Sequence, residues 1–306
     1  MARILLLGMI SGFPWVLIAS SLSLWLKEEG LSRSTIGWAG LIFAVYGFNW
    51  LWAPLIDRLR VPVLTDRLGH RKAWILILQA LILVCILFWS TIDPVSSLAL
   101  VIGAGLVIAI CSATQDITID ALRIEQIDKD DARGMAAGAA VAVVGWWSGF
   151  KLGGMAALFM ADYLETAGVA NYWQMTFIFL AVLVVLCNVG LLFIPEIGTR
   201  ERVERQRQAQ QAMADKMGGA GPVVQLVSFL TTTVIEPLWS FFRKNGMQIG
   251  IMILAFVFLF KIGEAFMGRM SIVFYKEVGF SKSDIAIYSK GLGWITTVVF
   301  TLIGGL

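Results

Sequence analysis

Charged residues are scarce in this sequence. Only 15% of the 306 residues are Asp, Glu, Lys or Arg, whereas 58% are hydrophobic and the mean hydropathy is +0.80. A soluble domain has about 25% charged and about 45–50% apolar residues, and a disordered chain is more polar still. The composition therefore excludes both classes and indicates a chain whose solvent is lipid.

Histidine and phosphate-binding motifs are also lacking. The single histidine, His70, excludes a multi-histidine zinc site, and the sequence contains no Gly-x-x-x-x-Gly-Lys-Ser/Thr motif to hold nucleotide phosphates. The three cysteines lie far apart inside apolar runs, which is typical of small buried side chains rather than of disulfides. No nucleophile and base pair stands out either. We therefore expect no metal, no cofactor and no enzymatic activity.

Long apolar windows are what the sequence has instead. Eight of them have the length of about 20 residues that a helix needs to cross a membrane. We expect all eight to be helices, because a spanning segment must satisfy its own backbone and the alternating pattern of barrel strands is absent. The windows cover residues 4–26, 36–56, 73–92, 98–118, 135–163, 173–194, 247–275 and 285–306.

The basic residues are distributed unequally between the two sides of these spans. If the N-terminus is cytoplasmic, 16 of the 24 Lys and Arg lie on the cytoplasmic side and four lie within spans. The other side holds only Lys27, Arg33, Lys276 and Lys282. The positive-inside rule therefore predicts a cytoplasmic N-terminus. The net charge of +3 reflects this topology and predicts no nucleic-acid partner.

Seven tryptophans lie near the ends of the predicted spans. An aromatic belt at the two membrane interfaces is typical of helical membrane proteins. We therefore expect these side chains to anchor the span ends among lipid headgroups. They are Trp25, Trp38, Trp50, Trp52, Trp74, Trp89 and Trp173.

An internal repeat gives the order of the spans. Residues 27–36 (KEEGLSRSTI) and 276–285 (KEVGFSKSDI) match at six of ten positions, offset by 249 residues, and each copy joins two spans. Parallel repeats of six spans are typical of major facilitator transporters. Both copies face the same side only if residues 223–242 do not cross, so we expect these residues to form an interfacial helix.

The repeat predicts three parts of the chain. Residues 1–194 form a complete six-helix half, residues 195–246 a cytoplasmic linker, and residues 247–306 the first two helices of a second half. The expected fold is an all-α polytopic membrane protein of the major facilitator type. Because four helices of the second half are missing from the sequence, we expect a truncated product or a fragment.

Polar residues in the fourth span form one candidate site. Gln115 and Asp116 lie in the span, and Asp120 and Arg123 follow just beyond it. The spacing of Asp116, Asp120 and Arg123 places two carboxylates and a cation on one helical face. This face predicts either a latch between helices or a proton site.

Charged residues in the seventh span form a second candidate site. Lys261 and Glu264 lie three residues apart inside an otherwise apolar helix, so they either neutralise one another as a structural pair or bind substrate and protons. Glu264 is the preferred proton carrier, because a carboxyl group in apolar surroundings takes up a proton more readily than one in water.

The fifth span combines a small-residue stripe with an aromatic and a cation. Gly145, Gly149 and Gly153 recur every four residues and predict a close-packing seam. Trp147 and Lys151 share another face, where they either present a plane and a charge to a substrate or pair with each other. In the first span, the Gly12-Phe13-Pro14 sequence predicts a break in the helical hydrogen bonding.

Three segments resemble the AmpG family of muropeptide permeases, within the major facilitator superfamily. They are Trp52-Ala-Pro-Leu-Ile-Asp57-Arg58, Cys111-Ser-Ala-Thr-Gln-Asp116-Ile-Thr-Ile-Asp120-Ala, and Phe260-Lys261-Ile-Gly-Glu264-Ala-Phe266. The resemblance runs along the whole chain. Thr65-Asp66-Arg67-Leu-Gly69-His70-Arg71-Lys72 is similar to the superfamily's gating loop between the second and third spans. Either Asp57, followed by Arg58, or Asp66, followed by Arg67, holds the acid position of that loop.

The resemblance implies proton-driven import of anhydro-muropeptides across the inner membrane for cell-wall recycling. Lys261, Glu264, Lys151, Trp147, Gln115 and Asp116 are then candidates for substrate or proton binding. Asp57, Arg58, Asp66, Arg67, Asp120 and Arg123 are candidates for gating. The alternatives are transport of another solute, or a relative of the same architecture that delivers pigment or cofactor during membrane assembly.

Overall fold

The structure is a computed structural model that describes residues 1–127, 131–196, 231 and 236–304. Its described part does not include the side chains of residues 54, 58, 236–238, 261, 262, 264–266, 268 and 269. The described residues form helices and no strands, and six of the helices are long and apolar enough to cross a membrane. The predicted all-α polytopic fold is confirmed.

The first two predicted spans are both interrupted helices. The first runs through α1 (Ala2–Gly12), the π-helix η1 (Val16–Ser21) and α2 (Leu22–Glu28). The predicted break is confirmed, because α1 ends two residues before Pro14, which cannot donate a backbone hydrogen bond. The second span, which we expected to be one helix, is divided into α3 (Arg33–Ala39), the 3-10 helices η2 (Gly40–Ala44) and η3 (Asn49–Leu51), α4 (Val45–Phe48) and α5 (Ala53–Arg58).

The remaining elements follow the predicted order. The short α6 (Leu64–Leu68) precedes four long helices, α7 (His70–Trp89), α8 (Leu98–Ile124), α9 (Ala132–Thr166) and α10 (Tyr172–Leu192). The second half begins after α13 (Glu236–Asn245) with α14 (Met247–Val278). Its second span consists of α15 (Lys282–Asp284), the π-helix η5 (Ile285–Leu292) and α16 (Gly293–Gly304).

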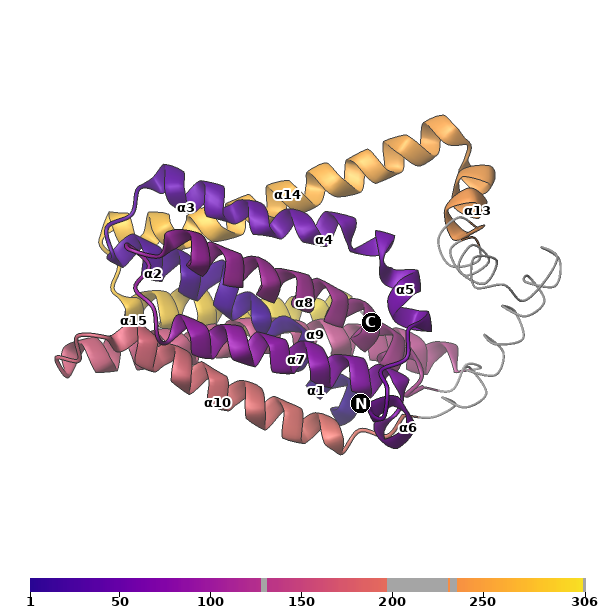
Figure 1. The fold of residues 1–306 in the computed structure, drawn as a ribbon, viewed down its shortest axis with the longest axis horizontal. Coiled ribbons are helices and arrows are strands. Elements are labelled where there is room, and N and C mark those ends of the chain that lie inside the picture. Colours follow the sequence, from indigo (N-terminus) through magenta and orange to yellow (C-terminus); the bar gives the residue numbers. More distant parts are fainter. Residues whose placement is uncertain (128–130, 197–230, 232–235, 305–306) are drawn as a thin grey trace.

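The helices lie side by side in one bundle (Figure 1). The start of α1 lies at the same end as α5, α6 and α13, and we call this the inner end. The α2–α3 and α14–α15 connections, which carry the two copies of the repeat, lie together at the opposite, outer end. The two halves meet where α14 packs on α2, η2 and α4, and where η5 and α16 pack on α9.

The glycine stripe of α9 is a close-packing seam, as predicted. A Cβ atom on Gly149 would lie 2.2 Å from the Met9 carbonyl oxygen, and one on Gly145 would lie 2.4 Å from the Leu5 carbonyl oxygen. Gly12 of α1 approaches the Trp146 backbone equally closely. Glycine is therefore required on both helices, because only backbones without side chains approach this closely.

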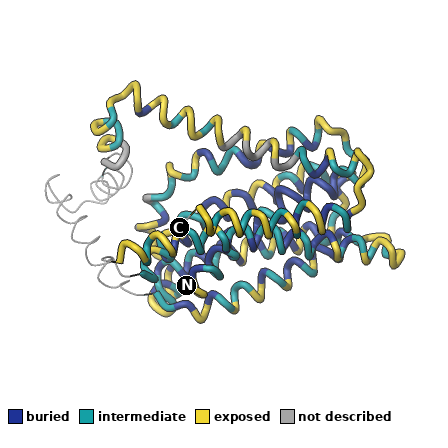
Figure 2. The backbone as a smooth tube through the Cα atoms, turned by 180° about the vertical axis from the view of Figure 1, so that it is seen from behind, coloured by how far each residue is buried: buried dark blue, intermediate teal, exposed yellow. Residues whose placement is uncertain are grey.

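Three of the seven tryptophans do not lie at the lipid interface, so the prediction was wrong for them. Trp25, Trp89 and Trp173 are completely or almost completely buried and surround Phe177 in the core near the outer end. Their position near span ends is the same as that of a lipid anchor, but they face the bundle axis. Trp38, in contrast, is 69% exposed. The exposed residues lie mainly on the outward faces of the helices (Figure 2), where large apolar side chains such as Leu186 and Phe256 are available to lipid.

The linker is described only at its two ends. The predicted interfacial helix over residues 223–242 lies outside the described residues except for position 231 and its last part, which belongs to α13. Helix α13 makes an angle of 110° with the start of α14, and Gly246 between them has a φ of 78°. Because this left-handed conformation favours glycine, Gly246 permits the sharp turn at the entry to the second half.

We expect Gly149→Ala to lower the thermal stability of the purified protein. The added methyl group would displace α1 from α9, and overpacking of this kind costs about 1–3 kcal/mol. Gly103→Ala in α8 is the matched control, because a Cβ atom there meets nothing within 4 Å. Melting curves in detergent test the prediction, and equal midpoints for the two variants would contradict it.

Candidate functional site

Gln115 connects three helices of the first half. Its side chain is completely buried. The side-chain amide accepts a hydrogen bond from Gln79 of α7 at 2.6 Å and donates one to the Ile10 carbonyl of α1 at 2.9 Å. Both ends of the amide are therefore used inside the bundle, and the role predicted for Gln115 in substrate or proton binding remains a prediction.

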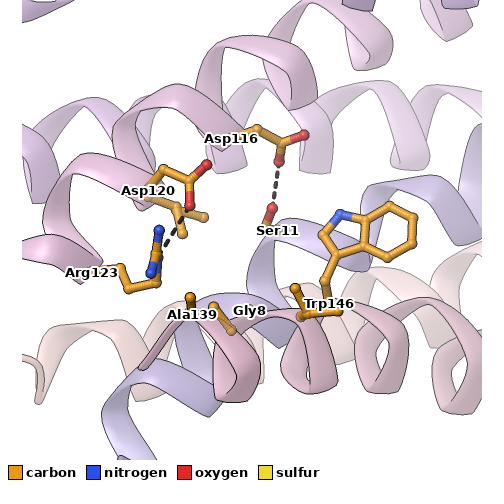
Figure 3. Close-up of a pocket in the computed structure, with 10 residues that line it drawn as sticks. Gly8, Ser11, Asp116, Asp120, Arg123, Ala139 and Trp146 are labelled. Carbon is orange, nitrogen blue, oxygen red and sulfur yellow. Dashed lines mark hydrogen bonds and ion pairs between the residues drawn. The ribbon is translucent and has the colours of Figure 1, made fainter. Parts of the chain in front are cut away.

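Asp116, Asp120 and Arg123 line one cavity near the inner end, in keeping with their spacing (Figure 3). The cavity of about 370 Å³ lies between α1, α8 and α9 and is also lined by Ser11 and Trp146. The Ser11 hydroxyl donates to an Asp116 carboxylate oxygen at 2.5 Å. The volume suffices for several water molecules, so the cavity has room to hydrate the Asp116 carboxyl group.

Asp120 and Arg123 pair with each other on the same helix. The Arg123 Nε atom lies 3.2 Å from an Asp120 carboxylate oxygen. Asp120 is exposed, so this pair lines the cavity where it is open to solvent and contributes little to stability. The pair does not connect two helices in this conformation, and the choice between latch and proton site remains a prediction for this face.

Trp147 and Lys151 are close to each other on α9, as their spacing predicts. The Lys151 ammonium group lies 5.6 Å from the centre of a Trp147 ring. The same ammonium group donates to the Ser289 carbonyl of η5 at 3.1 Å, so Lys151 reaches from the first half to the second. Lys151 therefore contacts Trp147 on its own helix and also faces the other half of the protein.

The gating-loop residues lie at the inner end of the first half. Asp66 forms an ion pair with Arg60 at 2.6 Å, and Asp57, Asp66 and Arg67 are exposed. The side chain of Arg58 lies outside the described part of the structure. Asp57 and Asp66 are on separate short helices, α5 and α6, and both remain candidates for the acid position of the loop.

The loop is held against the rest of the half by Glu196. Its carboxylate accepts backbone hydrogen bonds from Arg71 and Lys72 at the start of α7, at 2.9–3.0 Å. A carboxylate at a helix N-terminus satisfies free N–H groups and complements the helix dipole. The Arg71 guanidinium group also pairs with Glu125 at the end of α8 at 2.9 Å. The described contacts of this cluster therefore join α7 and α8 to Glu196, the second residue of the predicted linker.

The backbone of Lys261 and Glu264 lies in α14. Their side chains lie outside the described part of the structure. The roles predicted for them, as a structural pair or as substrate and proton site, therefore remain predictions.

A polar connection between the halves at the outer end was not predicted. At the outer end, Glu277 of α14 accepts two hydrogen bonds from Arg33 and one from Lys27, at 2.6–2.7 Å. Glu28 of α2 pairs in turn with Lys276 and Lys282 at 3.0 and 3.1 Å. We call these residues the outer latch.

Further residues of the first half contact Glu28 and Lys282. Tyr172 and Trp173 donate to the Glu28 carboxylate at 3.0 and 2.8 Å. Lys282 is completely buried and also pairs with Glu165 of α9 at 2.5 Å. Ser283 donates to Asp162 one turn earlier on α9, at 2.6 Å. The latch therefore joins α15 to α9 as well as to α2.

The hydrogen bonds to Glu277 favour the ionised form of its carboxyl group. It lies in the last turn of α14, beyond the predicted span that ends at residue 275. Hydrogen bonds from Arg33 and Lys27 hold the pKa of Glu277 below its usual range. The lowered pKa means that the ion pairs of Glu277 stabilise the folded protein fully at pH values above the ordinary pKa of a glutamate. This stabilisation is lost as the pH falls through the lowered pKa.

The repeat contained a signal for the outer latch. In each ten-residue copy the first position is Lys, the second is Glu and the seventh is basic. In the structure the first and seventh residues of each copy bind the second residue of the other copy. Identical charged positions in two copies that face the same side were the clue that reciprocal pairing was possible.

We expect Glu28→Gln to open the outer end. Loss of the carboxylate leaves Lys276 without its partner and Lys282 with Glu165 alone, and breaking a buried pair costs about 3–5 kcal/mol. The readout is Met155→Cys, a partly buried position on α9 next to Gly291, in a background without the three native cysteines. Its labelling by a membrane-impermeant maleimide should accelerate at least about tenfold.

Glu29→Gln is the matched control for this experiment. The Glu29 side chain is a neighbouring carboxylate that accepts a hydrogen bond from Trp25 at 3.3 Å and belongs to no ion pair among the described residues. Equal labelling rates in Glu28→Gln and in Glu29→Gln would show that the outer latch does not hold the outer end closed.

The fold and the site define a polytopic membrane protein with a cavity lined by charged residues between α1, α8 and α9 and with ion pairs that join its two helical halves at one end. The chain belongs to the Major Facilitator Superfamily, whose sequence model matches residues 4–306.

Several relatives are similar over nearly the whole chain and bear out the resemblance to the AmpG family. A Rickettsia conorii protein named AmpG 4 is 31% identical over 304 residues, which are 99% of this chain and 66% of the relative. The anhydromuropeptide permease of Escherichia coli K12 is 32% identical over 307 residues, which are 100% of this chain and 54% of the relative. The chain thus spans between about half and about two thirds of the length of these relatives.

Proposed function

We propose that this protein is part of a proton-coupled importer of anhydro-muropeptides in the inner membrane, with its N-terminus in the cytoplasm. The main support is the arrangement of the outer latch and the cavity. The outer latch joins the halves on the predicted periplasmic side, while Asp116 lines a polar cavity near the predicted cytoplasmic end. A transporter that is closed on the periplasmic side and open toward the cytoplasm has this asymmetry.

The relatives support the substrate class. The name of the E. coli relative states that it is an anhydromuropeptide permease. At 32% identity over the whole chain the superfamily is shared, and we infer that the substrate class is shared as well. These names favour transport over pigment or cofactor delivery.

We propose the following division of labour among the residues. Residues 1–194 form the first half, residues 195–246 the linker and residues 247–306 part of the second half. Asp116 and Glu264 carry protons, Trp147, Lys151 and Lys261 contact substrate, and the gating groups Asp57, Arg58, Asp66, Arg67, Asp120 and Arg123 act at the inner end. Asp116 suits proton transfer because its carboxylate combines one hydrogen bond from Ser11 with access to the cavity.

The test is uptake of labelled anhydro-muropeptide into right-side-out vesicles from cells that express the gene. We expect accumulation that requires a proton gradient and stops when an uncoupler is added. Asp116→Asn and Glu264→Gln should lower gradient-driven uptake by about tenfold or more. Both should retain exchange of internal for external substrate, because exchange requires binding but no net proton movement.

Asp93→Asn is the control, since Asp93 caps the turn between α7 and α8 at the outer end, away from the cavity. Uptake that is unchanged by the uncoupler would overturn proton coupling. Absence of uptake would overturn the proposed substrate.

A further inference from the structure

Two lysines from different halves meet within the bundle. Lys151 lies on α9, and Lys290 lies on η5, which packs against α9. Lys290 is only 6% exposed. The Lys151 ammonium group donates to the carbonyl of Ser289, the residue directly before Lys290. Two amine side chains, one from each half, therefore face one interface.

Glycines on the facing helices make room for these side chains. A Cβ atom on Gly293 of the second half would lie 2.7 Å from the Lys151 Nζ atom. A Cβ atom on Gly154 of the first half would lie 3.1–3.3 Å from the end of the Lys290 side chain. Each lysine thus extends over a glycine of the other half.

In the part of the chain that the structure describes, aromatic rings rather than carboxylates lie beside the two ammonium groups. Lys290 lies 4.1 Å from the centre of the Phe150 ring, and Lys151 lies over Trp147. Trp146 lies against both Trp147 and Phe150, at 5.1 and 5.7 Å between ring centres. Among the described side chains, no carboxylate pairs with Lys151 or Lys290. This contrasts with Lys282, eight residues earlier, which has two.

An amine in such a position is destabilising for the protein alone. Contact with aromatic faces compensates for only part of the lost hydration, and two like charges that share the site repel each other. An anion placed between them replaces this repulsion with two attractions. It also completes the hydrogen bonding of the two ammonium groups.

We propose that Lys151 and Lys290 form an anion site between the halves, and that it takes a carboxylate group of the transported solute. The inference rests on the proposed function for the identity of the solute, but not for the anion chemistry. The rings of Trp147 and Phe150 beside the charges favour an organic anion whose body has apolar or sugar faces. Because one lysine comes from each half, the bound carboxylate links the halves.

Binding to the purified protein, rather than transport, tests the site. Quenching of tryptophan fluorescence reports on a ligand beside Trp147. The probes are an anhydro-muropeptide with free carboxyl groups and the same compound with those groups amidated. We expect the wild type to bind the charged form at least about tenfold more tightly. Lys290→Gln and Lys151→Gln should each remove this preference, and Lys244→Gln, on the exposed end of α13, should keep it.

Two results separate this proposal from the proposed function. If the wild type binds both forms equally, the anion site is wrong while the substrate class stands. If it binds neither, the substrate class is wrong, and titration with acetate then decides the site. Quenching by acetate that is lost in Lys290→Gln supports the anion site, and quenching that is unchanged or absent in the wild type overturns it.

Melting temperatures distinguish a binding lysine from a structural one. We expect Lys290→Met to melt at a higher temperature than the wild type without ligand, because it removes a buried charge that has no carboxylate partner among the described residues. Lys282→Met should melt at a lower temperature, because it leaves Glu28 and Glu165 without their shared lysine. A lower melting temperature for Lys290→Met would show that Lys290 stabilises the fold and would overturn the proposal.

Discussion

A charge removed from water destabilises a protein by several kcal/mol unless an opposite charge and hydrogen bonds replace the water. This constraint determines the outer end of the bundle. Lys282 is completely buried and is compensated by Glu28 and Glu165, and Glu28 is itself surrounded by four donors. Because the partners belong to different halves, the charges are satisfied only when the halves are in contact. The closed outer end is thus a consequence of desolvation as much as of apolar packing.

The two copies of the repeat supply the opposite charges that compensate each other at the outer end. A pattern of Lys, Glu and a second basic residue occurs once in each half, and an approximate two-fold relation brings each Glu to the basic residues of the other copy. Such a surface is self-complementary in the same way as the interface of a symmetric dimer. The copies are not equivalent in burial, since Arg33 is 69% exposed whereas Lys282 is completely buried. The difference arises because Glu165 and the Tyr172 ring cover only Lys282.

The fold was largely predictable because lipid imposes a simple rule on the sequence. A helix that crosses a membrane must be long and apolar, so the spans and their order follow from hydropathy and from the repeat. The glycine seam was predictable for a similar reason, since small residues at four-residue spacing have few other uses in a membrane helix. The interruptions of the second span were not predicted, because glycine and proline are tolerated in membrane helices and do not by themselves locate a break.

The sites were less predictable, because periodicity gives a helical face but not the neighbour of that face. Asp116, Asp120 and Arg123 were correctly placed together, yet nothing in their spacing indicated that Ser11 of α1 is the partner of Asp116. Trp25, Trp89 and Trp173 have the sequence positions of lipid anchors and were misinterpreted for the same reason. Lys290 was noticed only as one of four basic residues within spans, since its neighbours Phe150 and Gly154 are about 140 residues away in the sequence.

The charges along α9 differ between its outer end and its middle, so the contact between the halves is not equally stable along the helix. At the outer end, Asp162 and Glu165 attract α15 through Ser283 and Lys282. About 20 Å further along the helix, at 1.5 Å per residue, Lys151 lies beside η5, the element that follows α15 and carries Lys290, and two like charges placed there repel each other. Attraction at one end and repulsion deeper in the bundle favour a second half that pivots about the outer latch. An anion between the lysines would remove the repulsion and stabilise the packing of η5 on α9, whereas its release would restore the tendency of the two elements to separate.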